Sequence, residues 1–395
     1  AYDRQKKLGA QFGQVNGWER PNYFGPVGAD ENFDHQSRSF RRGDWWEYAL
    51  AEAKAIRNGV GIIDATAFTK HIVKGPGASR FLDWFTCNRL PKVGRINLTY
   101  ALTDAGTTRT EYTIVRLKQD EFYLVSAGAW TDYDADFLIK SAEDKSPEFG
   151  YIEIQDVTSQ WGVFAVAGPK SRKFLSQLIR DEDQDTALSN ARFPWLSFKR
   201  VELAMCPVNA IRVSYTGELG WELHHPIEMQ NYLFDLLQSA GEKYELKWVG
   251  ARAQNWLRQE KSYRAFGTEL GRDATPLEAD LPRFVDMSKD FNGKMQMEKI
   301  GIRSKCVTFL IDGPVDADPW GREALYTEDG TERVGRLTSG GYSVVFEKSI
   351  GMGYVKPSYA IEGTKLKVKI QNALWDAVVT SDSPYDPKNE KLRDG

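Results

Sequence analysis

The stretch from Val213 to Pro226 reads Val-Ser-Tyr-Thr-Gly-Glu-Leu-Gly-Trp-Glu-Leu-His-His-Pro. Residues 215–218 predict a turn after a strand-like run at 211–213. Gly220 permits a second reversal, and residues 221–223 predict the next strand. The stretch therefore predicts a β-hairpin with a glycine-containing connection.

Two side chains of this predicted hairpin suggest a binding site. Tyr215 and Glu222 are expected to face one cavity, as a flat aromatic wall beside a carboxylate. A carboxylate accepts two hydrogen bonds from an amidine-like N–C–NH2 edge, so this pair suits a planar heterocycle that carries such an edge. The alternative is an ordinary hairpin with a solvated Glu222 and a packed Tyr215, and the spacing alone favours that alternative.

Length and composition limit the number of hydrophobic cores and the classes of binding partner. A chain of 395 residues can bury two or three cores, and its 12 tryptophans and 17 tyrosines fill cores before they line a pocket. The net charge of −3 argues against nucleic acid or a membrane surface as the main partner. No apolar run approaches the roughly 20 residues that a membrane-spanning helix needs.

The cysteines and the first residues indicate a compartment. Cys87, Cys206 and Cys306 are odd in number and widely spaced, which predicts buried free thiols in a reducing environment. Charged residues follow Ala1 at once, so no signal peptide is expected. We therefore expect a cytoplasmic protein, or a protein of the mitochondrial matrix if the source is eukaryotic.

Composition divides the chain into three regions. Residues 1–43 are polar and contain scattered Gly, Pro and Asn, which predicts an N-terminal arm. Residues 44–300 mix helical and strand-like spacing and predict a mixed α+β region. Residues 301–395 carry short alternating strands and predict a small all-β domain.

Local patterns predict particular elements within these regions. The arm is expected to be irregular and to pack on the rest through Trp18, Tyr23 and Phe24. A capping box at 44–47 predicts a helix that ends at Gly59. In the last region, strands are predicted at 307–311, 344–346, 352–355 and 366–370.

Several motifs, taken in order, resemble one family. The motif Tyr-Thr-Gly-Glu-x-Gly-x-Glu at 215–222 resembles a signature of the aminomethyltransferase family. This family comprises the tetrahydrofolate-binding T-protein of glycine cleavage and the C-terminal folate modules of dimethylglycine and sarcosine dehydrogenases. Residues 8–13 and 17–24 resemble the linker between the flavin and folate modules of the dimethylglycine dehydrogenase group. Further matches lie at 71–82, 166–170, 250–252, 275–279, 290–294, 341–343 and 350–355. The resemblance implies an α+β, three-lobed ring of two mixed subdomains and a C-terminal β-barrel around a central folate channel.

The resemblance also implies roles for individual side chains. It implies that Glu222 holds the pterin ring. It also implies that Tyr215 lines the folate channel and takes part in catalysis together with Glu111. Arg252 begins a helix and is expected to meet an anion, such as the folate tail or a substrate carboxylate. Tyr100 is expected to line the pocket, whereas Arg258 is expected to be structural.

Glu111 is the candidate catalytic group. It lies in the segment that resembles the family's strand with a catalytic Asp, so a longer side chain replaces the usual one. A carboxylate there can deprotonate a folate nitrogen or stabilise a cationic one-carbon donor. The alternative, held level with it, is a strand-edge Glu paired with Arg109 or Arg116.

Other kinds of site are not expected. His224 and His225 are adjacent on a predicted strand and therefore point to opposite faces, which indicates structural roles. With His35 and His71 as the only other histidines and no Cys-x-x-Cys, we expect no metal site. The chain also contains no Gly-x-Gly-x-x-Gly and no phosphate loop, so we expect no flavin or nicotinamide module within it.

These expectations converge on one-carbon chemistry. We expect a tetrahydrofolate-dependent methyl or methylene transferase, or demethylase, that acts on a small methylated compound such as dimethylglycine, sarcosine or a related onium or ether. One alternative is a folate module or subunit of a flavin-dependent N-methyl amine dehydrogenase, which requires a flavoprotein partner. Another is a non-catalytic folate-binding protein, because fold and function can part.

Overall fold

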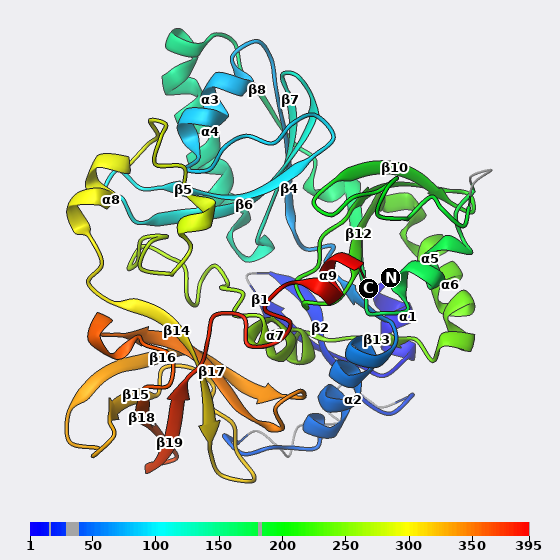
Figure 1. Ribbon diagram of the computed structural model, residues 1–395. Helices are drawn as coiled ribbons and strands as arrows, with labels where there is room; N and C mark the ends of the chain where they lie inside the picture. Colours follow the sequence, from blue (N-terminus) through cyan, green and yellow to red (C-terminus); the bar gives the residue numbers. More distant parts are fainter. Residues whose placement is uncertain (16, 29–38, 181–183, 395) are drawn as a thin grey trace.

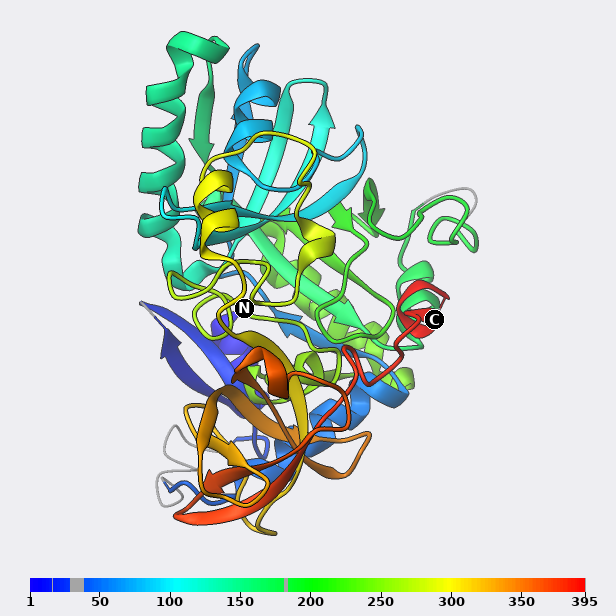
Figure 2. The ribbon, with the colours of Figure 1, turned by 60° about the vertical axis from the view of Figure 1, so that its left-hand side comes forward.

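The structure, a computed structural model, describes residues 1–15, 17–28, 39–180 and 184–394. Its strands form a two-stranded hairpin, a five-stranded sheet, a six-stranded sheet and a closed barrel. Figures 1 and 2 show the two sheets and the barrel as separate lobes, with helix α7 (Ala251–Glu260) near the middle of the first view. The predicted α+β class with a C-terminal β-barrel is therefore confirmed.

The five-stranded sheet has the order β5-β6-β7-β4-β8. Helices α3 (Ala78–Phe85) and α4 (Thr131–Phe149) cover one face, where they bury the Tyr112 and Ile114 side chains of β6. Val115 points to the opposite face and packs with Ile211 of the other sheet. The strands are β4 (Thr69–Lys74), β5 (Ile96–Leu102), β6 (Thr108–Lys118), β7 (Glu121–Ser126) and β8 (Glu153–Asp156).

The six-stranded sheet has the order β10-β11-β12-β9-β3-β13. Helices α5 (Ser171–Ser176) and α6 (Gln230–Gly241) pack against one face through a large apolar core that includes Trp221 and Leu223. A second core joins Ile63 of this sheet to α2 (Trp45–Asn58) and α7. The strands are β3 (Gly61–Asp64), β9 (Trp161–Ala167), β10 (Phe198–Leu203), β11 (Cys206–Ile211), β12 (Gly220–Pro226) and β13 (Lys247–Trp248).

The barrel closes in the order β14-β17-β16-β15-β18-β19. The predicted strand at 344–346 is wrong, because β16 and β17 pair with Ser343 opposite Lys348 and the four residues between them must form the turn. The alternation at 366–370 is confirmed, with Leu366, Val368 and Ile370 in the core. The strands are β14 (Lys305–Asp312), β15 (Ala324–Thr327), β16 (Arg333–Ser343), β17 (Lys348–Val355), β18 (Lys365–Ile370) and β19 (Ala373–Val379).

The described part of the N-terminal arm is regular, which corrects the prediction of an irregular segment. It forms α1 (Tyr2–Lys7) and an antiparallel hairpin of β1 (Ala10–Val15) and β2 (Trp18–Phe24). Tyr23 is buried in the α2–α7 core and Phe24 packs against the core of the six-stranded sheet, as expected. Trp18, which was expected to pack in the same way, is half-buried and belongs to neither core. The Glu52 carboxyl group of α2 accepts hydrogen bonds from the backbone N–H groups of Phe24 (2.6 Å) and Gly250 (2.8 Å), so it joins the arm to α7.

The predicted limits of helix α2 agree with the structure better than the prediction for the arm does. Helix α2 has Asp44 at its N-cap and Gly59 at its C-cap, as predicted, but the Asp44 side chain makes no capping hydrogen bond. Two short helices, α8 (Lys294–Ile300) and α9 (Glu390–Asp394), complete the described set. Within the described ranges, no helix combines the length and apolar character needed to cross a bilayer.

Candidate functional site

Glu111 and Tyr100 face each other across two neighbouring strands. They are directly opposite in the β5–β6 ladder, so both side chains lie on the same face of the sheet. Burial raises the pKa of Tyr100 well above its ordinary value, so its hydroxyl stays protonated and donates a hydrogen bond to the Glu111 carboxyl group. Burial also raises the pKa of Glu111 to about 7, although this hydrogen bond and the charge of Arg258 oppose the rise. Glu111 therefore changes its charge near neutral pH.

The alternative role for Glu111, a strand-edge carboxylate paired with a nearby arginine, is wrong. Strand β6 lies inside the sheet, between β5 and β7. Arg109 instead lies 3.7 Å from the Asp134 carboxylate, and Arg116 donates to the carbonyl of Gln119 at 2.7 Å. Arg116 lies an odd number of residues from Glu111 and therefore points to the other face of β6. Arg109 has the same parity as Glu111, but the β5–β6 ladder shifts its register between Ala101 and Leu102, and Arg109 turns toward α4, where it donates to the carbonyl of Tyr133.

Tyr215 lies in the loop that joins β11 to β12. The glycine of the motif is required there, because Gly217 has a φ of 86° and a Cβ at that position would lie 2.3 Å from the side chain of Lys261. The Tyr215 ring stacks on Tyr263 with a centroid distance of 5.9 Å, and its hydroxyl donates to the carbonyl of Arg264 at 3.0 Å. Burial raises the pKa of Tyr215 well above its ordinary value, so it remains a neutral phenol.

Arg258 on α7 is the cation whose charge acts on both Glu111 and Tyr215. Its guanidinium group is 2.9 Å from the Glu269 carboxylate and donates to the Ser339 hydroxyl at 2.6 Å. The predicted structural role fits these contacts with the barrel. Its electrostatic effect on the candidate site was missed, because nothing in the local sequence reports which side chains face an interior arginine.

Arg252 lies near the start of the same helix but meets different side chains. Its guanidinium group stacks over the ring of Trp45 at 3.8 Å and lies 5.5 Å from the ring of Trp320. An α-helix turns by about 100° per residue, so Arg252 and Arg258 point to different sides of α7. The charge of Arg258 therefore acts on Glu111 and Tyr215, and Tyr100 joins this group through Glu111, whereas Arg252 has an aromatic environment of its own.

Glu222 lies on β12 and is linked to a buried histidine and a tyrosine. Its carboxyl group is 3.2 Å from Nε2 of His224, and Nδ1 of the same ring is 2.9 Å from the hydroxyl of Tyr123 on β7. The Glu222 side chain keeps 15% exposure, whereas the His224 side chain has none. Sequence analysis missed this link, although the spacing of Glu222 and His224 by two residues is the strand period and was a readable signal.

Glu111 and Glu222 face the seam where the two sheets meet. Glu111 and Val115 share a face of β6, and Val115 is directly opposite Tyr123 in the β6–β7 ladder. Tyr123 in turn contacts His224, which shares a face of β12 with Glu222. The two carboxyl groups therefore come from different sheets toward one interface.

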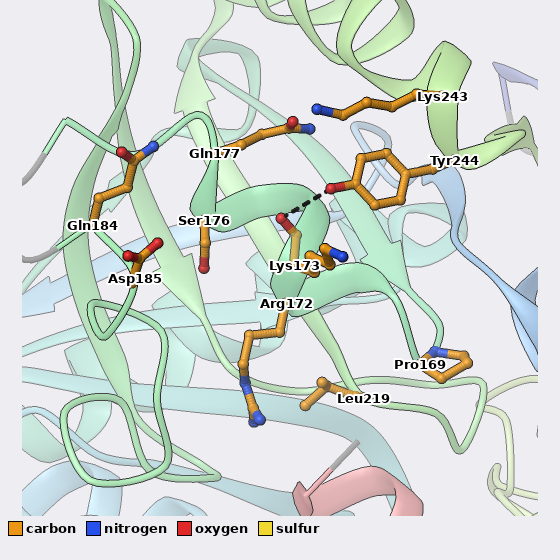
Figure 3. A pocket seen from close by; sticks show the side chains of 10 residues that line it. All are labelled: Pro169, Arg172, Lys173, Ser176, Gln177, Gln184, Asp185, Leu219, Lys243 and Tyr244. Atoms are coloured by element: carbon orange, nitrogen blue, oxygen red, sulfur yellow. Dashed lines mark hydrogen bonds between the residues drawn. The ribbon is translucent and has the colours of Figure 1, made fainter.

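An open pocket of about 670 Å³ lies elsewhere, beside α5 (Figure 3). Arg172, Lys173 and Lys243 give it a basic lining, and the Tyr244 hydroxyl donates to the Lys173 carbonyl at 3.4 Å. The other lining residues are Pro169, Ser176, Gln177, Gln184, Asp185 and Leu219. This pocket is separate in its lining from the seam that holds the predicted site.

The adjacent histidines point in opposite directions, as predicted. His224 meets Tyr123, whereas His225 packs on Phe164 with a ring-centroid distance of 4.9 Å. In the described part of the chain, no three side chains of His, Cys, Asp or Glu gather into a metal-binding group. His35, named in the sequence argument against a metal site, lies outside the described residues.

The three cysteines are buried and free, as predicted. Burial raises the pKa of Cys87 and of Cys206 to about 11, and that of Cys306 to about 12. All three are therefore protonated thiols at neutral pH and are poor nucleophiles.

Comparison with known proteins identifies relatives along the whole chain. The GCVT N-terminal domain model matches residues 1–289, and the glycine cleavage T-protein C-terminal barrel domain model matches residues 305–386. Mitochondrial dimethylglycine dehydrogenase of Homo sapiens is 35% identical over 371 residues, which cover 92% of this chain and 41% of that protein. This chain thus spans less than half the length of that dehydrogenase.

Two further relatives match over most of their own length. A probable aminomethyltransferase of Thermococcus kodakarensis is 30% identical over 375 residues, covering 87% of this chain and 91% of that protein. The crystal structure of glycine cleavage system aminomethyltransferase T from Bartonella henselae superposes with a TM-score of 0.80 at 22% identity, covering 98% of this chain and 97% of that one. The structural match establishes the fold, and the sequence matches establish that this chain belongs to the aminomethyltransferase (glycine cleavage T-protein) family, whose members are folate-dependent transferases.

Proposed function

We propose that this chain is a tetrahydrofolate-dependent one-carbon transferase that demethylates a small methylated compound, such as dimethylglycine, sarcosine or a related onium or ether. The observation that carries the proposal is Glu111, a carboxyl group with a pKa of about 7 on the seam that Glu222 also faces. A proton acceptor with a pKa near the operating pH is what general acid–base catalysis requires. The identity to dimethylglycine dehydrogenase supports an N-methyl donor.

The chemistry of the side chains fits a reduced folate. Glu222 is held by His224 through Oε2 and keeps partial exposure, so a carboxylate oxygen remains for the N–C–NH2 edge of a pterin. Glu111 and Tyr215 are partly accessible but strongly desolvated, a combination typical of side chains that line a narrow interior space. We assign Glu222 to pterin binding and Tyr215 to the wall of the same site.

Glu111 has the catalytic role in this proposal. Tetrahydrofolate supplies a secondary amine nitrogen that accepts the one-carbon unit and loses a proton. Glu111 in its ionised form accepts that proton on a carboxylate oxygen and stabilises positive charge on the donor. Tyr100 orients the carboxyl group by donating its hydrogen bond, and the Arg258 charge favours the ionised form.

We assign Arg252 to an anionic group at the other end of the ligand. The rings of Trp45 and Trp320 beside it offer apolar surface for the aromatic part of a folate. A guanidinium group binds a carboxylate with two parallel hydrogen bonds, so Arg252 suits the folate tail or the carboxylate of an amino-acid donor.

The decisive experiment identifies the folate product. The protein is incubated with tetrahydrofolate and each of several methylated donors, and the folate species are separated and weighed by mass spectrometry, with Glu111→Gln as the matched control. We expect methyl-folate or methylene-folate from one donor and far less from the variant. Tight folate binding with neither product from any donor, with or without an added flavoprotein, would overturn the transferase proposal in favour of a folate-binding protein.

A second candidate is a folate module that works with a flavin-dependent N-methyl amine dehydrogenase. The observation in its favour is that the related dehydrogenase is more than twice as long as the region matched here. A flavoprotein that oxidises the N-methyl group supplies a methylene donor, and the folate site then captures it. In the same experiment, methylene-folate that forms only when a dimethylglycine-oxidising flavoprotein is added would select this candidate.

A further inference from the structure

A buried chain of hydrogen bonds crosses from one sheet to the other and ends at Glu222. It runs from the Tyr123 hydroxyl on β7 to Nδ1 of His224 (2.9 Å) and from Nε2 of His224 to Oε2 of Glu222 (3.2 Å). The Tyr123 and His224 rings meet edge to face, with centroids 5.4 Å apart. Because the two ends of this chain belong to different sheets, its geometry depends on how the lobes pack together.

The protonation states of Tyr123 and His224 allow one consistent arrangement. Burial lowers the pKa of His224 despite the attraction of Glu222, so the imidazole is neutral and carries one N–H proton. Burial also raises the pKa of Tyr123 well above its ordinary value, so its hydroxyl remains a donor. The Tyr123 O–H therefore donates to Nδ1, which leaves the proton on Nε2, and this N–H donates to the Glu222 carboxylate.

We propose that Tyr123 and His224 are positioning residues that orient the Glu222 carboxylate for the N–C–NH2 edge of the bound heterocycle. The inference rests on the proposed function, since it takes Glu222 as the group that binds the pterin. His224 holds one carboxylate oxygen, and this directs the remaining acceptor sites toward the ligand. A second group that orients the first is a common feature of binding sites that depend on directional hydrogen bonds.

The test compares two ligands that differ only at the recognised edge. Dissociation constants for tetrahydrofolate and for 2-desamino-2-methyl-tetrahydrofolate, which lacks the amino group, are measured by isothermal titration calorimetry. Their ratio reports how well the carboxylate meets the amino group, whereas a general loss of folding weakens both ligands alike. The wild-type protein is expected to bind tetrahydrofolate at least about tenfold more tightly than the methyl analogue, because the analogue loses a hydrogen bond to a charged group.

Two amide variants of His224 separate its two nitrogen positions. His224→Gln places an amide nitrogen near the Nε2 position and is expected to keep the ratio within about twofold of wild type. His224→Asn places its amide near Nδ1, out of reach of Glu222, and is expected to lower the ratio roughly three- to tenfold, the range of one hydrogen bond. His225→Gln, a buried substitution on the opposite face of β12, is the matched control and is expected to leave the ratio unchanged.

Tyr123→Phe keeps the test valid if a His224 variant does not fold. It removes only the hydroxyl that sets the tautomer, and we expect the ratio to fall about threefold. A wild-type ratio in both His224→Asn and Tyr123→Phe would overturn the positioning role while leaving the proposed function intact. A wild-type protein that does not distinguish the ligands, or an unchanged ratio in Glu222→Gln, would instead overturn the assignment of Glu222 and this inference with it.

Discussion

Two desolvated carboxyl groups are influenced by the same arginine, yet their pKa values shift in opposite directions. Glu269 lies 2.9 Å from Arg258 and also accepts hydrogen bonds from the hydroxyls of Thr338 and Ser339. Although burial opposes ionisation, these partners hold the pKa of Glu269 below its ordinary value. Glu111 receives the Tyr100 hydroxyl and only the more distant effect of Arg258, and burial raises its pKa to about 7.

Glu269 and Glu111 show that a desolvated acid can serve either as a structural ion-pair partner or as a proton acceptor. Glu269 remains ionised because it is directly paired, so it joins α7 to the barrel and has no proton to exchange. The desolvation of the ionised Glu111 carboxylate is only partly offset by nearby donors and charges, so this group lowers stability but can accept a proton. The difference comes from the number of donors and charges around each carboxyl group, since both groups are strongly desolvated.

The largest expected effect is on turnover. Glu111→Gln keeps the size of the side chain and its contact with Tyr100 but removes proton transfer, so kcat is expected to fall about 10²- to 10⁴-fold. Folate affinity is expected to change little, because Glu222 makes the pterin contact in our proposal. Steady-state rates and calorimetric titration measure the two quantities, and unchanged turnover would remove Glu111 from the mechanism.

The next effect is on stability. Arg258→Met leaves Glu269 as an uncompensated buried charge, and the free energy of unfolding is expected to fall by about 3–5 kcal/mol. Arg252→Met, on the same helix, loses its stacking on Trp45 and is expected to cost about 1 kcal/mol. Urea denaturation measures the free energy of unfolding of both variants. Equal losses of stability would show that the pairing of Arg258 with Glu269 does not stabilise the fold more than the stacking of Arg252 does.

The two acids are expected to respond to pH with opposite signs. Between the ordinary value of 4.5 and about 7, Glu111 ionises in the unfolded chain but stays protonated in the folded one, so stability falls as pH rises. Glu111→Gln is therefore expected to be more stable than wild type by about 1–2 kcal/mol at pH 8 and similar at pH 4.5.

Glu269 provides the matched control for that slope. Its pKa is lowered by folding, so its contribution is present above the unfolded value of 4.5 and is lost as pH falls through the folded pKa. Glu269→Gln is expected to be less stable than wild type at pH 8, with a smaller difference in acid. Unfolding curves of both variants and of the wild type at pH 4.5 and pH 8 measure these differences. If the stability difference from wild type changed with pH in the same direction for both variants, the opposite pKa shifts of Glu111 and Glu269 would be contradicted.

The smallest expected effect is a shift in a pH profile. The Tyr100 hydroxyl favours the ionised form of Glu111, so Tyr100→Phe is expected to raise the pKa of Glu111 further. The acid limb of the rate profile should move to higher pH by about half to one unit, the value of one hydrogen bond. A limb that moves down or stays in place would show that Tyr100 does not support the carboxylate.

Much of the architecture was predictable because it depends on periodicity. The limits of α2, the alternation in β18 and the opposite directions of His224 and His225 all follow from the geometry of helix and strand. The arm at 1–28 and the turn at 344–347 were mispredicted, since pairing with a distant or neighbouring strand overrides composition.

The candidate site was only partly predictable. The residue types at Glu111, Tyr215 and Glu222 stand in motifs that a sequence displays, and the strand register explains why Tyr100 joins Glu111. Arg258 was missed as an influence on the site, because the direction of an interior side chain depends on how α7 packs against the barrel and the sheets.

By itself, the sequence determined the fold class, the barrel at the C-terminal end, the buried thiols and the residue types at the candidate site, because these follow from local pattern and ordered motifs. The tertiary structure decided which carboxyl group Arg258 pairs with and that Tyr123 meets His224. Both outcomes depend on contacts between segments more than 10 residues apart in the chain. Hydrogen bonding and desolvation act through space, so the shifted pKa of Glu111 and the contact between Tyr123 and His224 exist only once the lobes have packed.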